Sequence, residues 1–435
     1  MKRTKLSAKF WVALTIFSLV GQVAWVVENM YFNVFIYKMF HASETDISTM
    51  VSASAISATL TTILIGALSD KIGKRKLFIC GGYILWGISI WSFSLIRIDV
   101  IEKWIPLTIS AAAIGISLVI IMDCIMTFFG SAANDACFNA WLTDVTDDMN
   151  RGAAEGINSM MPLVAILVVF GGFMSFDLNK SESWTLIYQI IGITVLVLGV
   201  IGIFLIKDVP VDTSQNQNYF GNIFYGFRPS VIKANKLFYI ILVAFTIFSI
   251  SIQIYMPYLI LYYNVSLGMN DYVLIMAPAV IVAAIVTAFY GRVYDRYRFK
   301  IAIMPAVGSL MLGYVFLYLF KTTALVFVGS LFMMSGYLMG MAVFGAVLRD
   351  YTPENRAGMF QGLRITGQVL IPGIVGPWIG AKVLQNAKTI LNDDGTESFI
   401  PNENIFLAAF IAACVIWLVL GLIFKWMNKR KGDVA

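Results

Sequence analysis

Residues 46–97 read DISTMVSASAISATLTTILIGALSDKIGKRKLFICGGYILWGISIWSFSLIR, which is two long apolar runs separated by the basic segment GALSDKIGKRK at 66–76. Each run is close to the roughly 20 residues that an α-helix needs to cross a hydrocarbon core of about 30 Å. The runs are continuously apolar, whereas barrel strands alternate, and helices satisfy their own backbone groups in lipid. The stretch therefore predicts two transmembrane helices joined by a short, positively charged turn.

The same pattern recurs along the whole chain. Of its 435 residues 59% are hydrophobic and 13% are charged, compared with about 25% charged in an average soluble domain. Most of the surface must therefore face lipid, and the predicted fold class is an all-α polytopic membrane protein with twelve transmembrane helices. We place the spans at 10–37, 46–69, 77–97, 106–140, 157–176, 184–206, 236–263, 271–294, 301–319, 323–348, 357–385 and 403–427.

One polar connection is longer than the other internal connections and divides the spans into two sets of six. It runs from Lys207 to Lys236 and is rich in Gln, Asn and Ser. The predicted organisation is an N-terminal six-helix bundle at 1–206, a cytoplasmic linker at 207–235 and a C-terminal six-helix bundle at 236–435.

The basic residues indicate the orientation of the chain. Most of the 31 Lys and Arg residues fall in connections on the side that holds both termini, so both termini are predicted to be cytoplasmic, in a plasma membrane protein. The formal charge of +6 arises at span ends, which explains it by topology without a nucleic acid partner.

Two short segments recur at matching places in the two halves, and such repeats are how many transporters are built. GALSDKIGKRK at 66–76 is echoed by GRVYDRYRFK at 291–300, which loses the second glycine. The segment from Asp144 to Gly156 is echoed from Asp350 to Gly362. With these motifs the chain resembles the major facilitator superfamily over essentially its whole length, which implies two pseudo-symmetric six-helix bundles that rock around a central site.

A second motif narrows the resemblance. NDACFNAW at 134–141, followed by DVT at 144–146 and NRG at 150–152, resembles the glycoside-pentoside-hexuronide cation symporters and the sucrose-type carriers. The resemblance implies that Asp135 takes part in cation and sugar binding. Sodium-coupled members carry acids in span two, whereas Ile47 to Ser69 contains none. We therefore expect H⁺ as the coupling ion.

Polar residues within the spans are the candidates for solute binding and coupling, because an ionisable group at the bilayer centre costs at least about 2.5 kcal/mol. Span four carries Thr127, Ser131, Asp135 and Asn139 on one face. A desolvated carboxylate favours its protonated form, which makes Glu28 and Asp135 the proton candidates. The predicted substrate-binding and coupling residues are Glu28, Asn29, Asp135, Asn139, Arg364 and Gln368. The alternative is that these groups only join helices to one another.

Charged residues of the repeated segments form a second candidate group, a cytoplasmic gate whose ion pairs close one face of the membrane and release in the other state. Its predicted members are Asp70, Lys71, Arg75, Asp144, Arg151, Arg292, Asp295, Asp350 and Arg356. The alternative is that these charges only set the topology.

Aromatic residues in the spans could stack on a sugar ring, although packing and anchoring at the membrane interface explain most of them better. They are Trp25, Tyr31, Tyr255, Tyr258, Tyr262 and Trp378.

Three functions are open. The first is a solute:proton symporter for a sugar or glycoside. The second is a multidrug or other solute:proton antiporter of the same fold, which Met333, Met334, Met339 and Met341 would suit. The third is a membrane-embedded enzyme, which the single histidine, His41, and the lack of metal-ligand or phosphate-loop motifs disfavour. We expect no metal and no cofactor, a small-molecule solute and the lipid bilayer as partners, and a monomer.

Overall fold

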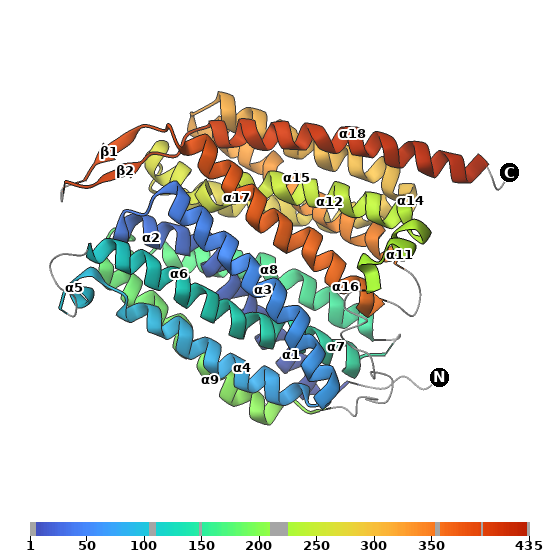
Figure 1. The fold of residues 1–435 in the computed structure, drawn as a ribbon, viewed down its shortest axis with the longest axis horizontal. Helices are drawn as coiled ribbons and strands as arrows, with labels where there is room; N and C mark the ends of the chain where they lie inside the picture. Colours follow the sequence, from blue (N-terminus) through green and yellow to red (C-terminus); the bar gives the residue numbers. More distant parts are fainter. Residues whose placement is uncertain are drawn as a thin grey trace. The chain divides into compact units, whose positions relative to one another are not determined.

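The computed structural model describes residues 6–103, 110–147, 150–208, 225–352, 357–392 and 395–432. The α-helices are α1 (Ala8–Val26), α2 (Phe32–Phe40), α3 (Glu44–Ile72), α4 (Arg75–Ser92), α5 (Ile98–Ile101), α6 (Ala111–Gly130), α7 (Asn139–Val145), α8 (Arg151–Phe173), α9 (Ser181–Leu205), α11 (Pro229–Ala234), α12 (Lys236–Tyr255), α13 (Leu259–Leu261), α14 (Val273–Leu319), α15 (Thr323–Asp350), α16 (Ala357–Ile365), α17 (Ile371–Leu384) and α18 (Asn404–Gly432). They are shown in Figure 1.

Shorter elements complete the described chain. The π-helical segments are Val27–Tyr31, Ser131–Phe138, Tyr262–Ser266 and Thr366–Leu370, and the 3₁₀ segments are Phe93–Leu95, Tyr225–Phe227 and Met256–Tyr258. A hairpin of β1 (Thr389–Leu391) and β2 (Glu397–Phe399) pairs Thr389 with Phe399. The π-helical segments and the 3₁₀ segments at 93–95 and 256–258 are departures from regular helix within the predicted spans. The hairpin lies in the connection between the spans predicted at 357–385 and 403–427.

The predicted transmembrane fold is confirmed. In the described part of the chain, eleven helical segments are long and apolar enough to cross a membrane. One of them, α14, has 47 residues, about 70 Å at 1.5 Å per residue, which is twice a bilayer core. Its backbone is not helical at Arg298. It therefore contains two of the predicted spans, 271–294 and 301–319, and twelve spans result.

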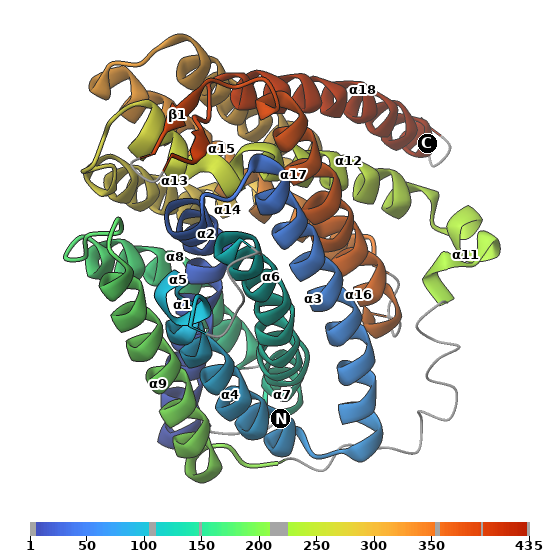
Figure 2. The same cartoon turned by 60° about the vertical axis from the view of Figure 1, so that its left-hand side comes forward.

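Two compact units make up the chain, Met1–Tyr219 and Phe220–Ala435. The boundary falls within 207–235. In the first unit α4 packs along α9, α1 along α8 and α3 along α6, and Figures 1 and 2 show α4 beside α9. In the second unit α14 packs with α15, and α12 with α17 and α18.

Glycines permit the closest helix contacts in each unit. A Cβ atom on Gly87 of α4 would collide with the backbone of Leu196 on α9, and one on Gly336 of α15 would collide with the backbone of Leu310 on α14. Small residues allow close approach where lipid provides no hydrophobic drive for helix association. These glycines therefore set the interhelical distance.

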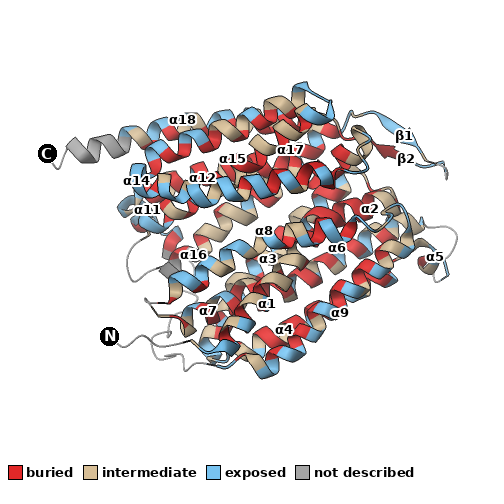
Figure 3. Ribbon diagram, turned by 180° about the vertical axis from the view of Figure 1, so that it is seen from behind, coloured by how far each residue is buried: buried red, intermediate tan, exposed pale blue. Residues whose placement is uncertain are grey.

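Buried and exposed residues alternate along the long helices, as Figure 3 shows. In α4, Tyr83, Trp86 and Ile90 are buried, whereas Leu85 and Ile88 are exposed. Exposed aliphatic side chains at helical spacing would be a liability in water. In a membrane-spanning helix they are the lipid-facing surface.

The two repeated turns close differently. Gly73 ends α3 with φ 69°, a left-handed conformation that glycine adopts without steric cost. Arg298 occupies the matching place in the second segment, with φ 58° and ψ −176°. That region of backbone space is nearly restricted to glycine and costs about 1–3 kcal/mol otherwise. The second segment has lost the glycine and keeps the positive φ, whereas its ψ angle differs from the 18° of Gly73.

Replacing Arg298 by glycine should therefore stabilise the protein by about 1 kcal/mol or more, because it relieves this backbone strain. The exposed side chain of Arg298 contributes little to packing. Thermal unfolding of the purified protein in detergent measures the effect. Arg296→Gly, at an ordinary helical position two residues away, should destabilise it by about 1 kcal/mol. A lower Tm for both variants would contradict the strain argument.

Candidate functional site

Most of the predicted binding residues lie in or beside π-helical turns. Glu28 and Asn29 belong to Val27–Tyr31, Asp135 to Ser131–Phe138 and Gln368 to Thr366–Leu370. Single π-helical turns inside α-helices are rare and frequent at functional sites. They also change the angle between successive side chains, so residues that regular α-helical spacing would put on one face lie on different faces before and after the turn. Asn29 is exposed, whereas Asn33 one turn later is buried.

The backbone of the first π turn is supported by its own side chains. Asn29 Nδ2 donates a hydrogen bond to the Trp25 carbonyl at 2.7 Å, and Asn33 Nδ2 donates to the Asn29 carbonyl at 3.1 Å. These local bonds compete with regular helical pairing. The amides therefore help the chain to keep the irregular turn that presents Glu28.

The Glu28 carboxyl is buried among hydroxyls, with 7% of the residue exposed. Its Oε1 accepts hydrogen bonds from Ser54 Oγ on α3 at 2.6 Å and from Thr127 Oγ1 on α6 at 2.9 Å. The two hydroxyl oxygens are 2.9 Å apart. Glu28 Oε2 has no hydrogen-bond partner among the described residues. The carboxyl therefore joins three spans through one oxygen and leaves the other free.

Asp123 is a second buried acid that the sequence interpretation missed. It lies on α6 with 1% of the residue exposed, and its polar neighbours are Glu28 and Ser54. Its Oδ1 has no hydrogen-bond partner in the described chain. The position precedes Thr127 by four residues, so it extends the predicted polar face of span four by one step. Following that face in both directions would have found it.

No basic group neutralises this pair of acids within the described part of the chain. Besides acting on each other, Glu28 and Asp123 interact with Ser54, Thr127 and Asp135, and the Tyr188 hydroxyl lies within electrostatic reach of Asp123. Two adjacent carboxylates in a medium of low dielectric repel each other and lose hydration. The cluster of Glu28, Ser54, Asp123 and Thr127, here called the acid cluster, therefore requires a proton or another cation for charge balance.

Asp135 lies farther along the same helix, where the polar face becomes accessible. Ser131 Oγ donates to Asp135 Oδ2 at 3.0 Å, and the Trp25 indole N–H lies beside the carboxylate without completing a hydrogen bond to it. Thr127 and Ser131 are buried, Asp135 is half-buried and Asn139 is exposed. The predicted polar track thus leads from the acid cluster to the surface of the first unit.

Asn139 is held at the outer end of the track. Its Nδ2 donates to the Asp135 carbonyl at 3.2 Å, and its Oδ1 accepts from Asn158 Nδ2 of α8 at 3.5 Å. Asn158 also accepts a hydrogen bond from Ser18 Oγ of α1. The amide of Asn139 therefore belongs to a chain of side chains that connects α1, α8 and the fourth span.

In the second unit Arg364 and Gln368 are half-buried on the eleventh span. A Cβ atom built on Gly345 of α15 would lie 3.6 Å from the Arg364 guanidinium, an ordinary van der Waals distance, so the guanidinium packs beside this glycine. The prediction that Arg364 and Gln368 bind substrate together with residues of the first half stays a prediction.

Most of the aromatic candidates are core residues. Tyr255, Tyr258 and Tyr262 are fully buried in the second unit, Tyr31 packs on Phe173 in the first, and Trp378 is exposed. Trp25 is half-buried beside Asp135. Trp25 is therefore the member of the group whose position suits contact with a solute.

The methionines of span ten are placed in the interior of the second unit. Met333, Met334 and Met339 are buried, and Met341 is half-buried. Flexible methionine side chains suit promiscuous binding surfaces, but these three are occupied in packing.

Arg75 is the centre of the predicted gate residues in the first unit. It is 5% exposed and pairs with Asp70, and its Nε lies 3.1 Å from Asp144 Oδ2. It also donates to Ser69. The guanidinium thus fastens the turn after α3 to the end of α7. Lys71 is exposed and forms no ion pair among the described residues.

Arg151 binds backbone oxygens. It donates to the carbonyls of Thr143 and Thr146 at 3.2 Å each, and to Thr146 Oγ1 at 3.3 Å. Carbonyls at the end of a helix lack intrahelical donors and carry negative partial charge. Arg151 therefore caps α7.

In the second unit the two repeated segments, at 291–300 and from Asp350, are joined by a hydrogen bond in place of an ion pair. Tyr294, which stands where the first segment has Ser69, donates from Oη to Asp350 Oδ2 at 2.6 Å. Arg292 lies over the Phe289 ring at 5.5 Å. Asp295 is exposed and forms no ion pair within the described ranges. Arg356 lies outside the described residues. The Tyr294–Asp350 hydrogen bond joins α14 to the end of α15 within the second half.

Comparison with known proteins agrees with this architecture. A family model described as Major Facilitator Superfamily matches residues 12–377, whereas no curated protein sequence matches the chain. A variant of the nucleoside transporter NupG is 13% identical over 95% of this chain and 99% of its own, with a TM-score of 0.73.

Two further solved structures share the fold. One is a bacterial homologue of the human lysosomal transporter Spinster in an inward-facing, unoccupied conformation. It is 14% identical over 98% of this chain and 99% of its own, with a TM-score of 0.70. The other is the xylose transporter XylE from E. coli in a partially occluded, inward-open conformation. It is 14% identical over 95% of this chain and 97% of its own, with a TM-score of 0.66. Because the family model spans most of the sequence, the chain is a multi-pass membrane transporter that belongs to the Major Facilitator Superfamily.

Proposed function

We propose that the protein is a secondary active transporter that moves a small polar solute, a sugar or glycoside, by proton-coupled symport with alternating access. The proposal places it in the plasma membrane with both termini in the cytoplasm. The observation that carries it is the acid cluster, in which Glu28 and Asp123 are buried without a basic partner in the described chain. Proteins of similar fold include a nucleoside transporter and a D-xylose–proton symporter, which supports a polar, hydroxyl-rich solute.

Charge balance is the physical basis for proton coupling. Removing a carboxylate from water costs several kcal/mol unless it is neutralised. A proton on either Glu28 or Asp123 removes the repulsion between them, and the unpartnered oxygens, Glu28 Oε2 and Asp123 Oδ1, are where it can bind. A carboxyl that exchanges this proton as access alternates links the proton gradient to transport.

Solute binding is assigned to the accessible end of the track. Asp135 presents a half-buried carboxylate that can accept hydrogen bonds from sugar hydroxyls, and such charge-assisted bonds are about twice as strong as neutral ones. Trp25 offers an apolar ring face beside it. Asn139 and Asn29 contribute amides, and Arg364 and Gln368 are the proposed contacts from the second half.

Uptake of labelled monosaccharides and disaccharides into proteoliposomes tests the function directly. With a proton gradient imposed, acidic outside, we expect accumulation of at least one of these sugars above equilibrium. A sodium gradient at constant pH should not drive it. Accumulation driven by sodium would overturn proton coupling, and a panel without any uptake would overturn the assignment of a sugar or glycoside.

Two substitutions should separate coupling from binding. Glu28→Gln imitates the protonated acid, so it should abolish accumulation driven by a pH gradient while sugar exchange between equal concentrations continues. Asp135→Asn should weaken sugar binding by about 10- to 100-fold, the value of one charge-assisted hydrogen bond. Counterflow and equilibrium binding measure the two effects. Undiminished pH-driven accumulation in Glu28→Gln would exclude it as the coupling residue.

Arg364 is expected to be required for transport because its guanidinium is half-buried in a membrane span, where such a group is rare without a function. Arg364→Ala should reduce counterflow to background at unchanged expression. Retained transport in this variant would remove Arg364 from the site.

Arg75→Gln should lower both stability and transport, because it leaves Asp70 and Asp144 without their shared cation. Both acids are partly exposed, so we expect a loss of about 1–3 kcal/mol, measured by thermal unfolding in detergent. Lys74→Gln is the control, since Lys74 is exposed at the same turn. An Arg75 variant as stable as this control would show that the ion pairs contribute nothing to the fold.

A further inference from the structure

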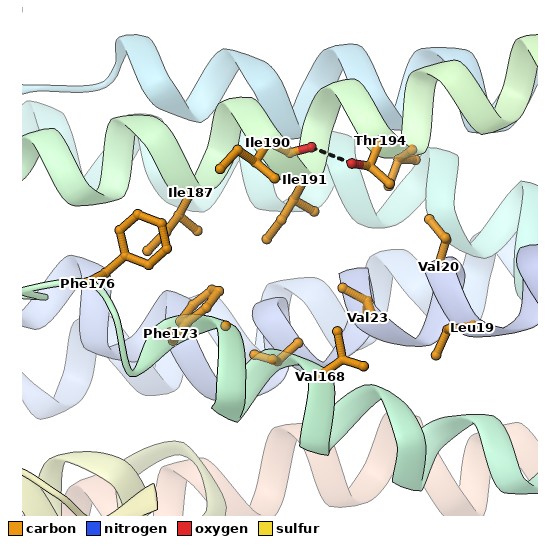
Figure 4. Close-up of a pocket in the computed structure, with 13 residues that line it drawn as sticks. Leu19, Val20, Val23, Val168, Phe173, Phe176, Ile187, Ile190, Ile191 and Thr194 are labelled. Atoms are coloured by element: carbon orange, nitrogen blue, oxygen red, sulfur yellow. Dashed lines mark hydrogen bonds between the residues drawn. The ribbon is translucent and has the colours of Figure 1, made fainter.

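An apolar groove runs along one side of the first unit, away from the acid cluster. It has a volume of about 390 Å³ and is formed by α1, α8 and α9. Figure 4 shows Val23 of α1, Phe173 of α8, and Ile187 and Ile191 of α9 directed into it. The volume lies within the range of about 300–1,000 Å³ that is typical of ligand sites.

The groove exists because α8 and α9 both pack on α1. Its floor is closed, since Val169, Phe173 and Ile187 are buried. Its rim is open, with Val168 49% and Ile190 50% exposed. A Cβ atom on Gly172 would meet nothing within 4 Å, so the groove is unobstructed at this glycine.

The lining excludes a polar ligand. Twelve of the 13 lining residues are aliphatic, aromatic or glycine, and the other is Thr194. The Thr194 hydroxyl already donates to the Ile190 carbonyl at 2.7 Å, as the dashed line in Figure 4 shows. No side chain in the lining is left to bind a polar group. A ligand of this groove must therefore be hydrocarbon.

The surroundings supply that hydrocarbon. The three helices are long and apolar enough to span a membrane, and acyl chains are the hydrocarbon that surrounds such helices. Protein interiors are packed as densely as organic crystals, and a void of this size forfeits dispersion contacts along all of its walls. An acyl chain restores these contacts, whereas water finds no partners there.

Charged groups of both signs lie at one end of the groove. Phe176 of the lining is followed by Asp177, whose Oδ2 is 3.6 Å from Lys180 Nζ. Lys38 Nζ donates to Asn179 Oδ1 at 2.8 Å. Hydrogen bonds from Asn179 and the nearby Lys180 keep the pKa of Asp177 below its usual range. Cations and an anion beside the end of an apolar groove match the phosphate and ammonium of a lipid headgroup.

We propose that the groove between α1, α8 and α9 binds one acyl chain of a membrane phospholipid, with the headgroup at Lys38, Asp177 and Lys180. The site is independent of solute transport. It would hold a resident lipid against α8 and so connect the composition of the membrane with the packing of the first unit.

Photo-crosslinking tests the proposal. The full-length protein is reconstituted in vesicles of phosphatidylethanolamine and phosphatidylglycerol that contain a phosphatidylethanolamine with a diazirine in one acyl chain. After illumination, mass spectrometry locates the labelled peptides. We expect labelling concentrated on peptides that contain Phe173 to Ile191, above that of the exposed lipid-facing residues of α18, such as Leu418.

Neighbouring glycines provide a matched pair of variants. Gly172 lines the groove, whereas Gly171 does not, and both are exposed with open space at the Cβ position. Gly172→Phe should abolish the concentrated labelling, and Gly171→Phe should keep it, with equal thermal stability as evidence of folding. Equal labelling of both variants, or labelling no stronger than on α18, would overturn the proposal. Displacement of the label by an apolar dye but not by unlabelled phospholipid would assign the groove to another ligand and overturn it as well.

Discussion

The structure depends on one constraint, which is the absence of water in the hydrocarbon core of the membrane. Glu28 illustrates it by accepting hydrogen bonds from Ser54 and Thr127. Every polar group in the hydrocarbon region must find its partner within the protein. The Glu28 carboxyl does so by drawing together the first, second and fourth spans. The requirement is not fully met, since one oxygen each of Glu28 and Asp123 has no partner in the described chain. These two oxygens are the sites that we propose for the coupling proton.

The two halves meet the same geometric requirement with different residues. The repeated turn needs a positive φ, which Gly73 adopts freely and Arg298 adopts under strain. The link from that turn to the following repeated segment is an ion pair through Arg75 in one half and a hydrogen bond from Tyr294 in the other. The positive φ is shared between the halves, whereas the ψ angle at this position and the side-chain chemistry around it differ. A functional role assigned to one residue therefore does not transfer to its echo.

Packing in lipid explains both the tight and the loose regions of the bundles. Where glycine faces a neighbouring backbone, as at Gly87 and Gly336, helices approach closely. Where large aliphatic residues of α1, α8 and α9 face one another, a groove remains. In water such a groove would tend to collapse, because apolar burial is favourable there. In lipid, acyl chains can complete the surface instead.

The sequence by itself determined the number and approximate positions of the spans, the polar connection between the halves and the repeated turns. These features follow from local properties: apolar run length, charge at span ends and short motifs. Only the tertiary structure decided that Ser54, Thr127 and Asp123 surround Glu28, since the two hydroxyls that bind Glu28 lie 26 and 99 residues away in the chain. It also decided the π-helical turns, which hydropathy does not register, and the groove beside α1. Contacts between distant spans depend on helix rotation and depth, and a pattern of residues along one helix does not specify them.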